Sequence, residues 1–264
     1  MRDFHLPGRS ATYAANGMAA TSHPIAAQVA VEMLKAGGNA VDAAIAGALV
    51  LGIAEPQMTG IGGDCFVLLK PAGTEQIVAL NGSGRAPLGL DAALLRDRGL
   101  ARIPIQGIEA VTLPGAIDAF CRLNADYGLK SLAETLAPAI HYAEEGIPVA
   151  PRVAFDWADD IACLQGAARD FYSFAGQAPK PGQIFRAPGQ AEVLRRIARE
   201  GRAGFYQGEV AEDMITSLQA LGGCHRLEDL ALTACDWTNP VFGPYHGIDL
   251  VEHPPNGQGA TAIL

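Results

Sequence analysis

Apolar residues recur at helical spacing near the start of the chain and predict a helix that begins at Pro24, which Ser22 can cap. Gly37-Gly38 ends this helix, because glycine adopts the left-handed conformation after a helix at little cost. A second helix is predicted over Asn39–Ile53, with Asp42 at the capping-box position. Both consist mainly of Ala, Val, Ile and Leu, so we expect them to be largely buried.

The pattern then changes to that of a β-hairpin. A glycine-rich turn, Thr59–Asp64, leads into a predicted strand at Cys65–Leu69 and, after a turn at Pro71–Thr74, into a second strand at Gln76–Leu80. These strands have few polar positions, which predicts a sheet covered on both faces. A loop, Asn81–Pro87, is expected to follow.

The rest of the chain has a mainly helical pattern. We therefore expect a sheet-contributing part at about 1–90, a mainly helical part at about 91–235 and a hairpin at about 240–253. An apolar helical pattern at Ala260–Leu264 stops within one turn, so we expect the chain to be cut inside an element. The predicted helices are Asp91–Arg98, Gly115–Tyr127, Leu132–Glu144 (with a Ser131/Glu134 capping box), Pro151–Leu164, Gln190–Glu200 and Glu209–Leu221, and the hairpin strands are Val241–Tyr245 and Ile248–Glu252 with His246-Gly247 at the turn.

The amino-acid composition is typical of a globular protein that does not bind nucleic acid. The 264 residues are 49% hydrophobic and 18% charged, as in ordinary globular chains, with a net charge of −9 that makes nucleic acid an unexpected partner. The five cysteines are widely spaced and form no C-x-x-C pair, which favours reduced thiols and a cytoplasmic protein. The start, residues 1–10, has no apolar signal-peptide region, and Val41–Ala54 is too short to span a bilayer. We expect no membrane association.

Few single motifs indicate chemistry. Gly60–Gly63 could cradle a phosphate, but it precedes a strand instead of opening a helix, so a tight turn with close backbone approach is favoured. The six histidines have no metal-ligand spacing, and we expect neither a metal nor a cofactor. Arg85 follows an apolar strand in a glycine-flanked loop, where its planar guanidinium suits a carboxylate. A surface salt bridge or a clamp on backbone carbonyls is an equally good interpretation.

A set of short strings, which we call the landmark segments, spreads in order over nearly the whole chain. In this order they resemble the γ-glutamyltransferase family, and together they are far more specific than any one of them. The landmark segments are Ala20–Ala26, Gly37–Ala44, Thr59–Asp64, Gly84–Pro87, Leu113–Gly115, Phe205–Gly208 and Pro254–Gly257.

The resemblance implies an α+β fold, the αββα sandwich of the N-terminal-nucleophile hydrolases, of which this chain is the large-subunit part only. Members of that family cleave themselves, and the new N-terminal threonine of the small subunit attacks the amide with its own α-amine as base. That threonine is expected beyond Leu264, so no catalytic residue is assigned here and the chain alone is expected to be inactive. The implied partners are a small-molecule amide and the C-terminal small subunit of the same precursor, with a homo-oligomer of such heterodimers as a further option.

One departure concerns the substrate. Members specific for γ-glutamyl groups have an arginine that binds the substrate's α-carboxylate, and counting back from Ala86-Pro87 puts Ser83 at that position and Arg85 two residues later. Either Arg85 reaches the same carboxylate or the substrate differs, so Arg85 and Ser83 are the candidate substrate-binding residues. The Asn-Gly-Ser-Gly-Arg-Ala-Pro string resembles an intracellular branch that includes acylases and an oxamate amidohydrolase. We expect an amide hydrolase or acyltransferase acting on γ-glutamyl compounds such as glutathione or on a related small amide; the alternatives are a non-γ-glutamyl amidohydrolase or acylase, and a non-catalytic remnant or scaffold.

Overall fold

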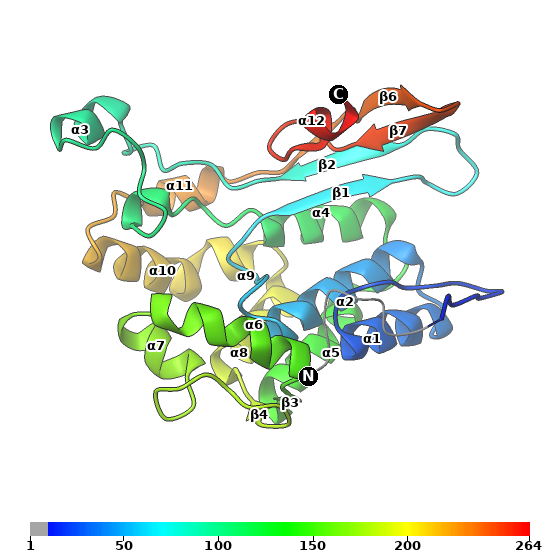
Figure 1. Cartoon of the computed structure of the whole chain (residues 1–264), viewed down its shortest axis with the longest axis horizontal. Helices are drawn as coiled ribbons and strands as arrows, with labels where there is room; N and C mark the ends of the chain where they lie inside the picture. Colours follow the sequence, from blue (N-terminus) through cyan, green and yellow to red (C-terminus); the bar gives the residue numbers. More distant parts are fainter. Residues whose placement is uncertain (1–9) are drawn as a thin grey trace. The chain divides into compact units, whose positions relative to one another are not determined.

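The computed structural model describes residues 10–264, which form two compact units (Figure 1). The first unit contains the chain up to Gly60 and Gly128–Ala198, and the second contains Ile61–Tyr127 and Arg199–Leu264. The prediction that the chain start has no signal-peptide region concerns residues that lie, except for residue 10, outside the described residues.

The helices are α1 (Pro24–Lys35), α2 (Ala40–Ala54), α3 (Ala92–Asp97), α4 (Ala116–Tyr127), α5 (Leu132–Glu145), α6 (Pro151–Asp160), α7 (Gly166–Tyr172), α8 (Pro188–Glu200), α9 (Ala203–Tyr206), α10 (Gly208–Ala220), α11 (Leu227–Leu232) and α12 (Gly259–Ile263). The strands are β1 (Cys65–Leu69), β2 (Val78–Gly82), β3 (Ile147–Pro148), β4 (Ile184–Phe185), β5 (Asp236–Thr238), β6 (Val241–Tyr245) and β7 (Ile248–Glu252), and two 3₁₀ turns occupy Ile108–Ala110 and Ile161–Cys163.

Helix α2 forms the centre of the first unit. It packs against α1 on one side and α5 on another, and Ile45, Leu49 and Ile53 are each at most 1% exposed. Because its residues are apolar around the whole circumference, α2 needs neighbours on more than one face. The prediction of a largely buried helix is confirmed for α2. It is wrong for α1, which buries only one face, through Ala26, Val29, Ala30 and Met33.

The start of α2 has the predicted capping box. Asn39 Oδ1 accepts the N–H groups of Val41 and Asp42 at 2.9 and 3.1 Å, and Asp42 Oδ2 accepts the Asn39 N–H at 2.8 Å. The Asp42 side chain, fully buried, also accepts the N–H groups of Leu129 and Lys130. This carboxylate therefore ties the start of α2 to the segment before α5.

The cap predicted for α1 is wrong. His23, not Ser22, is the N-cap, and its Nδ1 accepts the N–H of Ile25 at 3.2 Å. Ser22 instead donates its hydroxyl to Glu55 Oε2 at 2.6 Å. The end of α1 agrees with the prediction, since Gly37 has a φ of +87°.

The second unit contains a three-stranded antiparallel sheet in the order β1-β2-β5. The predicted hairpin is confirmed, with Val67 opposite Leu80, but β2 runs from Val78 to Gly82 and so takes in Asn81 and Gly82, which were expected in the loop. Strand β5, which was not predicted, pairs with β2 so that Asp236 lies opposite Asn81. The second hairpin, β6–β7, has the predicted bounds and turns at His246 and Gly247, both with positive φ.

Coverage of this sheet differs between its strands. Ala79 and Leu80 of β2 are fully buried, and helix α4 packs against β1 and β2 (Figure 1). On β1, Phe66 and Leu68 keep 43% and 41% of their surface exposed. The prediction of a sheet covered on both faces is therefore wrong for β1 within this chain.

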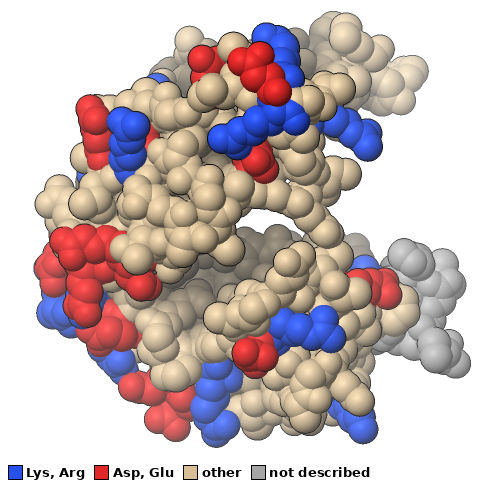
Figure 2. All heavy atoms as spheres, turned by 90° about the vertical axis from the view of Figure 1, so that its left-hand side faces the viewer, with Lys and Arg blue, Asp and Glu red and all other residues tan. Residues whose placement is uncertain are grey.

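The helices predicted from the sequence occur within about two residues of their expected bounds, except that one of them ends earlier than expected. Helix α6 ends at Asp160 and a 3₁₀ turn over Ile161–Cys163 replaces the predicted last turn. In the described part of the chain, no helix has the length and apolar character needed to cross a membrane. Figure 2 shows Lys and Arg side chains lying among Asp and Glu side chains on the face in view, in place of one extended basic patch.

Candidate functional site

The loop that follows β2 holds both sequence-predicted residues, and three hydrogen bonds fix its backbone. Gly84 donates its N–H to Asp64 Oδ1 at 2.7 Å, Ser83 donates its N–H to Asn81 Oδ1 at 3.0 Å, and the carbonyl of Arg85 accepts the Leu113 N–H at 2.9 Å. Asp64 closes the glycine-rich landmark segment, so one landmark segment positions the next.

Glycine is required here by space. A Cβ on Gly84 would lie 1.7 Å from the Leu113 carbonyl oxygen, and one on Gly115 would lie 2.2 Å from the Gly82 carbonyl oxygen. The Gly63 carbonyl accepts the N–H groups of both Gly115 and Ala116, at 3.0 and 2.9 Å. Within Gly60–Gly63 the Gly63 carbonyl therefore supports the start of α4, but a Cβ on Gly60 or Gly62 would meet no atom within 4 Å, so the close backbone approach expected there is not found at these two glycines.

A small polar pocket opens beside this loop. Arg85 Nη2 lies 3.4 Å from Asp236 Oδ2, and Asn81 Nδ2 donates to Asn256 Oδ1 at 3.0 Å. The structure thus brings Ser83 and Arg85 together, and it adds Asn81, Asp236 and Asn256, which the sequence reasoning did not single out. The lining residues are Asn81, Ser83, Gly84, Arg85, Ala234, Asp236 and Asn256.

Arg85 remains available to a ligand. Its side chain is 72% exposed and that of Asp236 is 69% exposed, so their ion pair is a weak one. The Ser83 hydroxyl makes a long contact of 3.5 Å with the Gly84 carbonyl. The pocket therefore offers one cation, one anion and several neutral hydrogen-bonding groups to a small polar molecule.

A hydrogen-bond network centred on Asp118 holds the segment that leads into β5. The Asp118 carboxylate accepts the Arg202 guanidinium and the Cys235 N–H, the latter at 2.7 Å, and Arg202 also donates to the Thr233 carbonyl. Tyr206, 1% exposed, donates its hydroxyl to the Pro114 carbonyl at 2.8 Å and accepts the Asp118 N–H at 3.1 Å. The landmark segment around Tyr206 therefore supports the site without entering the pocket.

The thiols near this network are not nucleophiles at neutral pH. Burial, with a smaller contribution from Asp118, raises the pKa of Cys121 to about 11 and that of Cys235 to about 12. Burial and Asp64 likewise raise the pKa of Cys65 to about 11. Thiols with such values remain protonated, which leaves none of these cysteines as a candidate for covalent catalysis.

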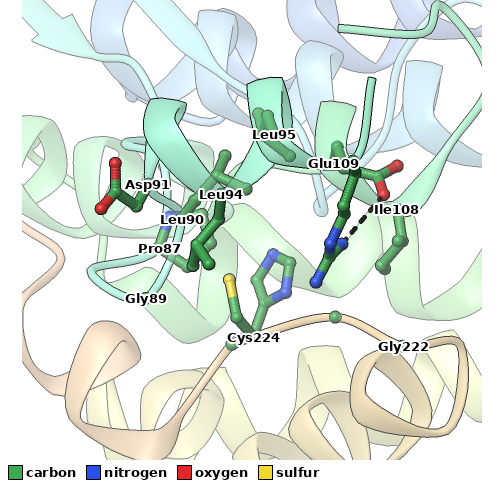
Figure 3. Close-up of a pocket in the computed structure, with 13 residues that line it drawn as sticks. Pro87, Gly89, Leu90, Asp91, Leu94, Leu95, Ile108, Glu109, Gly222 and Cys224 are labelled. Carbon is green, nitrogen blue, oxygen red and sulfur yellow. Dashed lines mark ion pairs between the residues drawn. The ribbon is translucent and has the colours of Figure 1, made fainter. Parts of the chain in front are cut away.

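Figure 3 shows another pocket of the second unit, beside α3, lined by apolar residues such as Leu94 and by Cys224. His225, 1% exposed, lies in its wall and uses Nε2 to donate to the Val111 carbonyl at 2.8 Å, while an ion pair of 3.7 Å joins Arg98 to Glu109. No polar side chain of a landmark segment lines this pocket. Within residues 10–264 no group of three His, Cys, Asp or Glu side chains is placed to hold a metal ion.

The chain is similar to known proteins over most of its length. The family model described as gamma-glutamyltranspeptidase matches residues 26–264. The glutathione hydrolase-like YwrD proenzyme of Bacillus subtilis is 35% identical over 94% of this chain and 47% of its own length, so the chain spans about half of that relative.

Two crystal structures are similar to the whole described chain. A cephalosporin acylase from Bacillus halodurans is 41% identical with a TM-score of 0.91, over 98% of this chain and 50% of that one. The gamma-glutamyltranspeptidase of Helicobacter pylori is 29% identical with a TM-score of 0.89, over 96% of this chain and 74% of that one. The expected α+β fold, the large-subunit part of the N-terminal-nucleophile hydrolase sandwich, is confirmed. The chain belongs to the gamma-glutamyltranspeptidase family.

Proposed function

We propose that this chain is the large-subunit part of an amide hydrolase or acyltransferase that is made as a self-cleaving precursor. The family membership and the proenzyme name of the Bacillus subtilis relative support a precursor, and the 47% share of that relative's length supports a large-subunit part. The observation that carries the proposal is the polar pocket of Ser83, Arg85 and Asn256, to which two landmark segments contribute residues and which others support.

In the proposed reaction the N-terminal threonine of the small subunit attacks the amide carbonyl, with its own α-amine accepting the hydroxyl proton. The carbonyl–nitrogen bond breaks as the protonated α-amine passes its proton to the departing amine, and the acyl group stays on the threonine oxygen as an ester. Water or a second amine then attacks this ester and gives a proton to the α-amine, which returns it to the threonine oxygen as the acyl group leaves, while hydrogen-bond donors stabilise the oxyanion in both steps. The part of this chain is to bind the acyl donor. Arg85 would pair with a carboxylate of the donor, and the Ser83 hydroxyl would add a neutral hydrogen bond.

The proposed substrates are γ-glutamyl compounds such as glutathione or a related small amide. A second candidate, an acylase or amidohydrolase whose donor has no γ-glutamyl group, is favoured by a specific observation. Ser83 stands where the family's γ-glutamyl-specific arginine is expected, and serine has no charge for a bidentate contact. The 41% identity to the cephalosporin acylase supports the same candidate.

We also propose a cytoplasmic location, for which the support is chemical. All five cysteines are free in the structure, and unpaired thiols are typical of reducing compartments.

The test is an assay of the complete protein against glutathione, glutamine, glutaryl amides and oxamate, with the released amine measured. Turnover of at least one amide is expected, and Arg85→Ala should raise KM for a carboxylate-bearing donor more than tenfold, on the order of a lost charge-assisted contact. Arg98→Ala is the matched control, since Arg98 is also exposed and paired with a single carboxylate of the second unit. Failure to turn over any of these amides would refute the proposed activity, and an unchanged KM would assign Arg85 to structure.

A further inference from the structure

Arg85 has a fixed acidic neighbour in its pocket. Asp236 belongs to β5, and the pairing of β5 with β2 sets it directly opposite Asn81, two residues before Ser83. Its carboxylate lies 3.4 Å from the guanidinium of Arg85. The two charges come from segments 151 residues apart and meet only because the sheet forms.

Both backbones are held in place, so this meeting does not depend on a free loop. On one side Cys235 donates its N–H to Asp118, which Arg202 also binds, immediately before Asp236. On the other side Leu113 donates its N–H to the Arg85 carbonyl. The side chains can rotate, but neither residue can leave the pocket without breaking these contacts.

The ion pair of Arg85 and Asp236 determines the net charge of the pocket into which a ligand binds. Arg85 and Asp236 cancel, and the remaining polar side chains of the pocket, such as Ser83 and Asn256, are neutral. A donor carboxylate that binds Arg85 must displace Asp236 and then remain close to a second negative charge. Displacement is feasible because the pair is exposed and therefore weak, yet it lowers the net gain from binding.

We propose that Asp236 is a specificity-determining residue of this site. In the free protein it forms an ion pair with Arg85, and it thereby disfavours acyl donors whose only charge in this pocket is a carboxylate. The inference rests on the proposed function, because it takes Arg85 as the group that receives the donor's carboxylate. On this proposal, the opposite charges of Arg85 and Asp236 together determine whether the site prefers carboxylate-bearing or uncharged donors.

The test compares two donors of the same shape and leaving group, glutaryl-p-nitroanilide and its analogue with a carboxamide in place of the carboxylate. In the complete protein Asp236→Asn is expected to raise the ratio of kcat/KM, glutaryl over carboxamide, by roughly two- to fivefold, through KM. Asp249→Asn, an exposed aspartate on β7, makes the same charge change in the same unit and should leave the ratio unaltered. An unchanged ratio in Asp236→Asn, or an equal change in both variants, would overturn the inference.

A second arm separates this inference from the proposed function. Glutarate binding, measured by calorimetry on the same variants, should tighten by a similar factor in Asp236→Asn, and the gain should vanish when Arg85→Ala is added. If the protein turns over no amide but this pattern is found, the proposed function fails, and what stands is that Asp236 opposes carboxylate binding at Arg85. If amides are turned over and the pattern is absent, only the role of Asp236 fails.

Discussion

Replacing Gly84 by alanine tests whether close backbone contact between landmark segments positions the site. The added Cβ would lie 1.7 Å from the Leu113 carbonyl oxygen, whereas real Cβ atoms essentially never come within 3.0 Å of such an atom. The opposing backbone cannot easily yield, because Leu113 donates to Arg85 and the next carbonyl, that of Pro114, accepts the Tyr206 hydroxyl. The loop must therefore shift by more than an ångström and lose its bonds to Asp64 and Leu113.

The expected cost is about 3 kcal/mol, from the two lost hydrogen bonds and the overpacking together. Urea denaturation of the complete protein measures it, and the amide assay is expected to show a parallel loss of kcat/KM because Ser83 and Arg85 move with the loop. Gly62→Ala is the matched control: it belongs to the neighbouring landmark segment, and its Cβ would meet no atom within 4 Å. Equal stability of the two variants would refute the reasoning.

Two further predictions concern buried groups. Asp42→Ala leaves three backbone N–H groups without the fully buried carboxylate that accepts them, and should lower the free energy of unfolding by about 2–4 kcal/mol in urea denaturation. Asp97→Ala on the exposed end of α3 should change it by less than about 0.5 kcal/mol, and similar losses in both variants would contradict the role given to Asp42. In the folded protein the pKa is about 11 for Cys121 and about 12 for Cys235, both above the ordinary value of 9.0. As the pH rises, the unfolded chain therefore loses these two protons before the folded chain does. The stability that the protonated thiols contribute is complete below pH 9 and declines above it. Urea midpoints between pH 8 and pH 10.5 should therefore fall less steeply for Cys121→Ala than for the natural chain, and identical slopes would count against this account.

The elements predicted from the sequence are those whose signals are local. The capping boxes of α2 and α5 each lie within four residues, as do the two positive-φ residues that turn the β6–β7 hairpin. Strand β5 has three residues and no alternation of its own. Its place depends on β2 and on the bond from Cys235 to Asp118, 117 residues away, so no local pattern could reveal it. Ser22 was misassigned for a similar reason, since its partner Glu55 lies 33 residues along the chain.

The candidate site divides in the same way. Arg85 could be named because the loop after an apolar strand is visible in the sequence, whereas Ser83 was named through the family resemblance. Asn256 lies in a landmark segment that could have marked it. Asp236 carried no signal, because only the pairing of β5 with β2 brings it to Arg85. The exposed apolar side chains of Phe66 and Leu68 on β1 were equally unforeseen, since a sequence pattern cannot show which chain covers a strand.

The central claim is that this chain is one part of a self-cleaved precursor whose reactive threonine belongs to the other part. The most direct test is the intact mass of the complete protein after purification, together with the N-terminal residue of each polypeptide found. The account predicts two polypeptides that stay together, the larger containing this chain and the smaller beginning with threonine. One uncleaved polypeptide, or a smaller one that begins with a residue other than threonine, would contradict it.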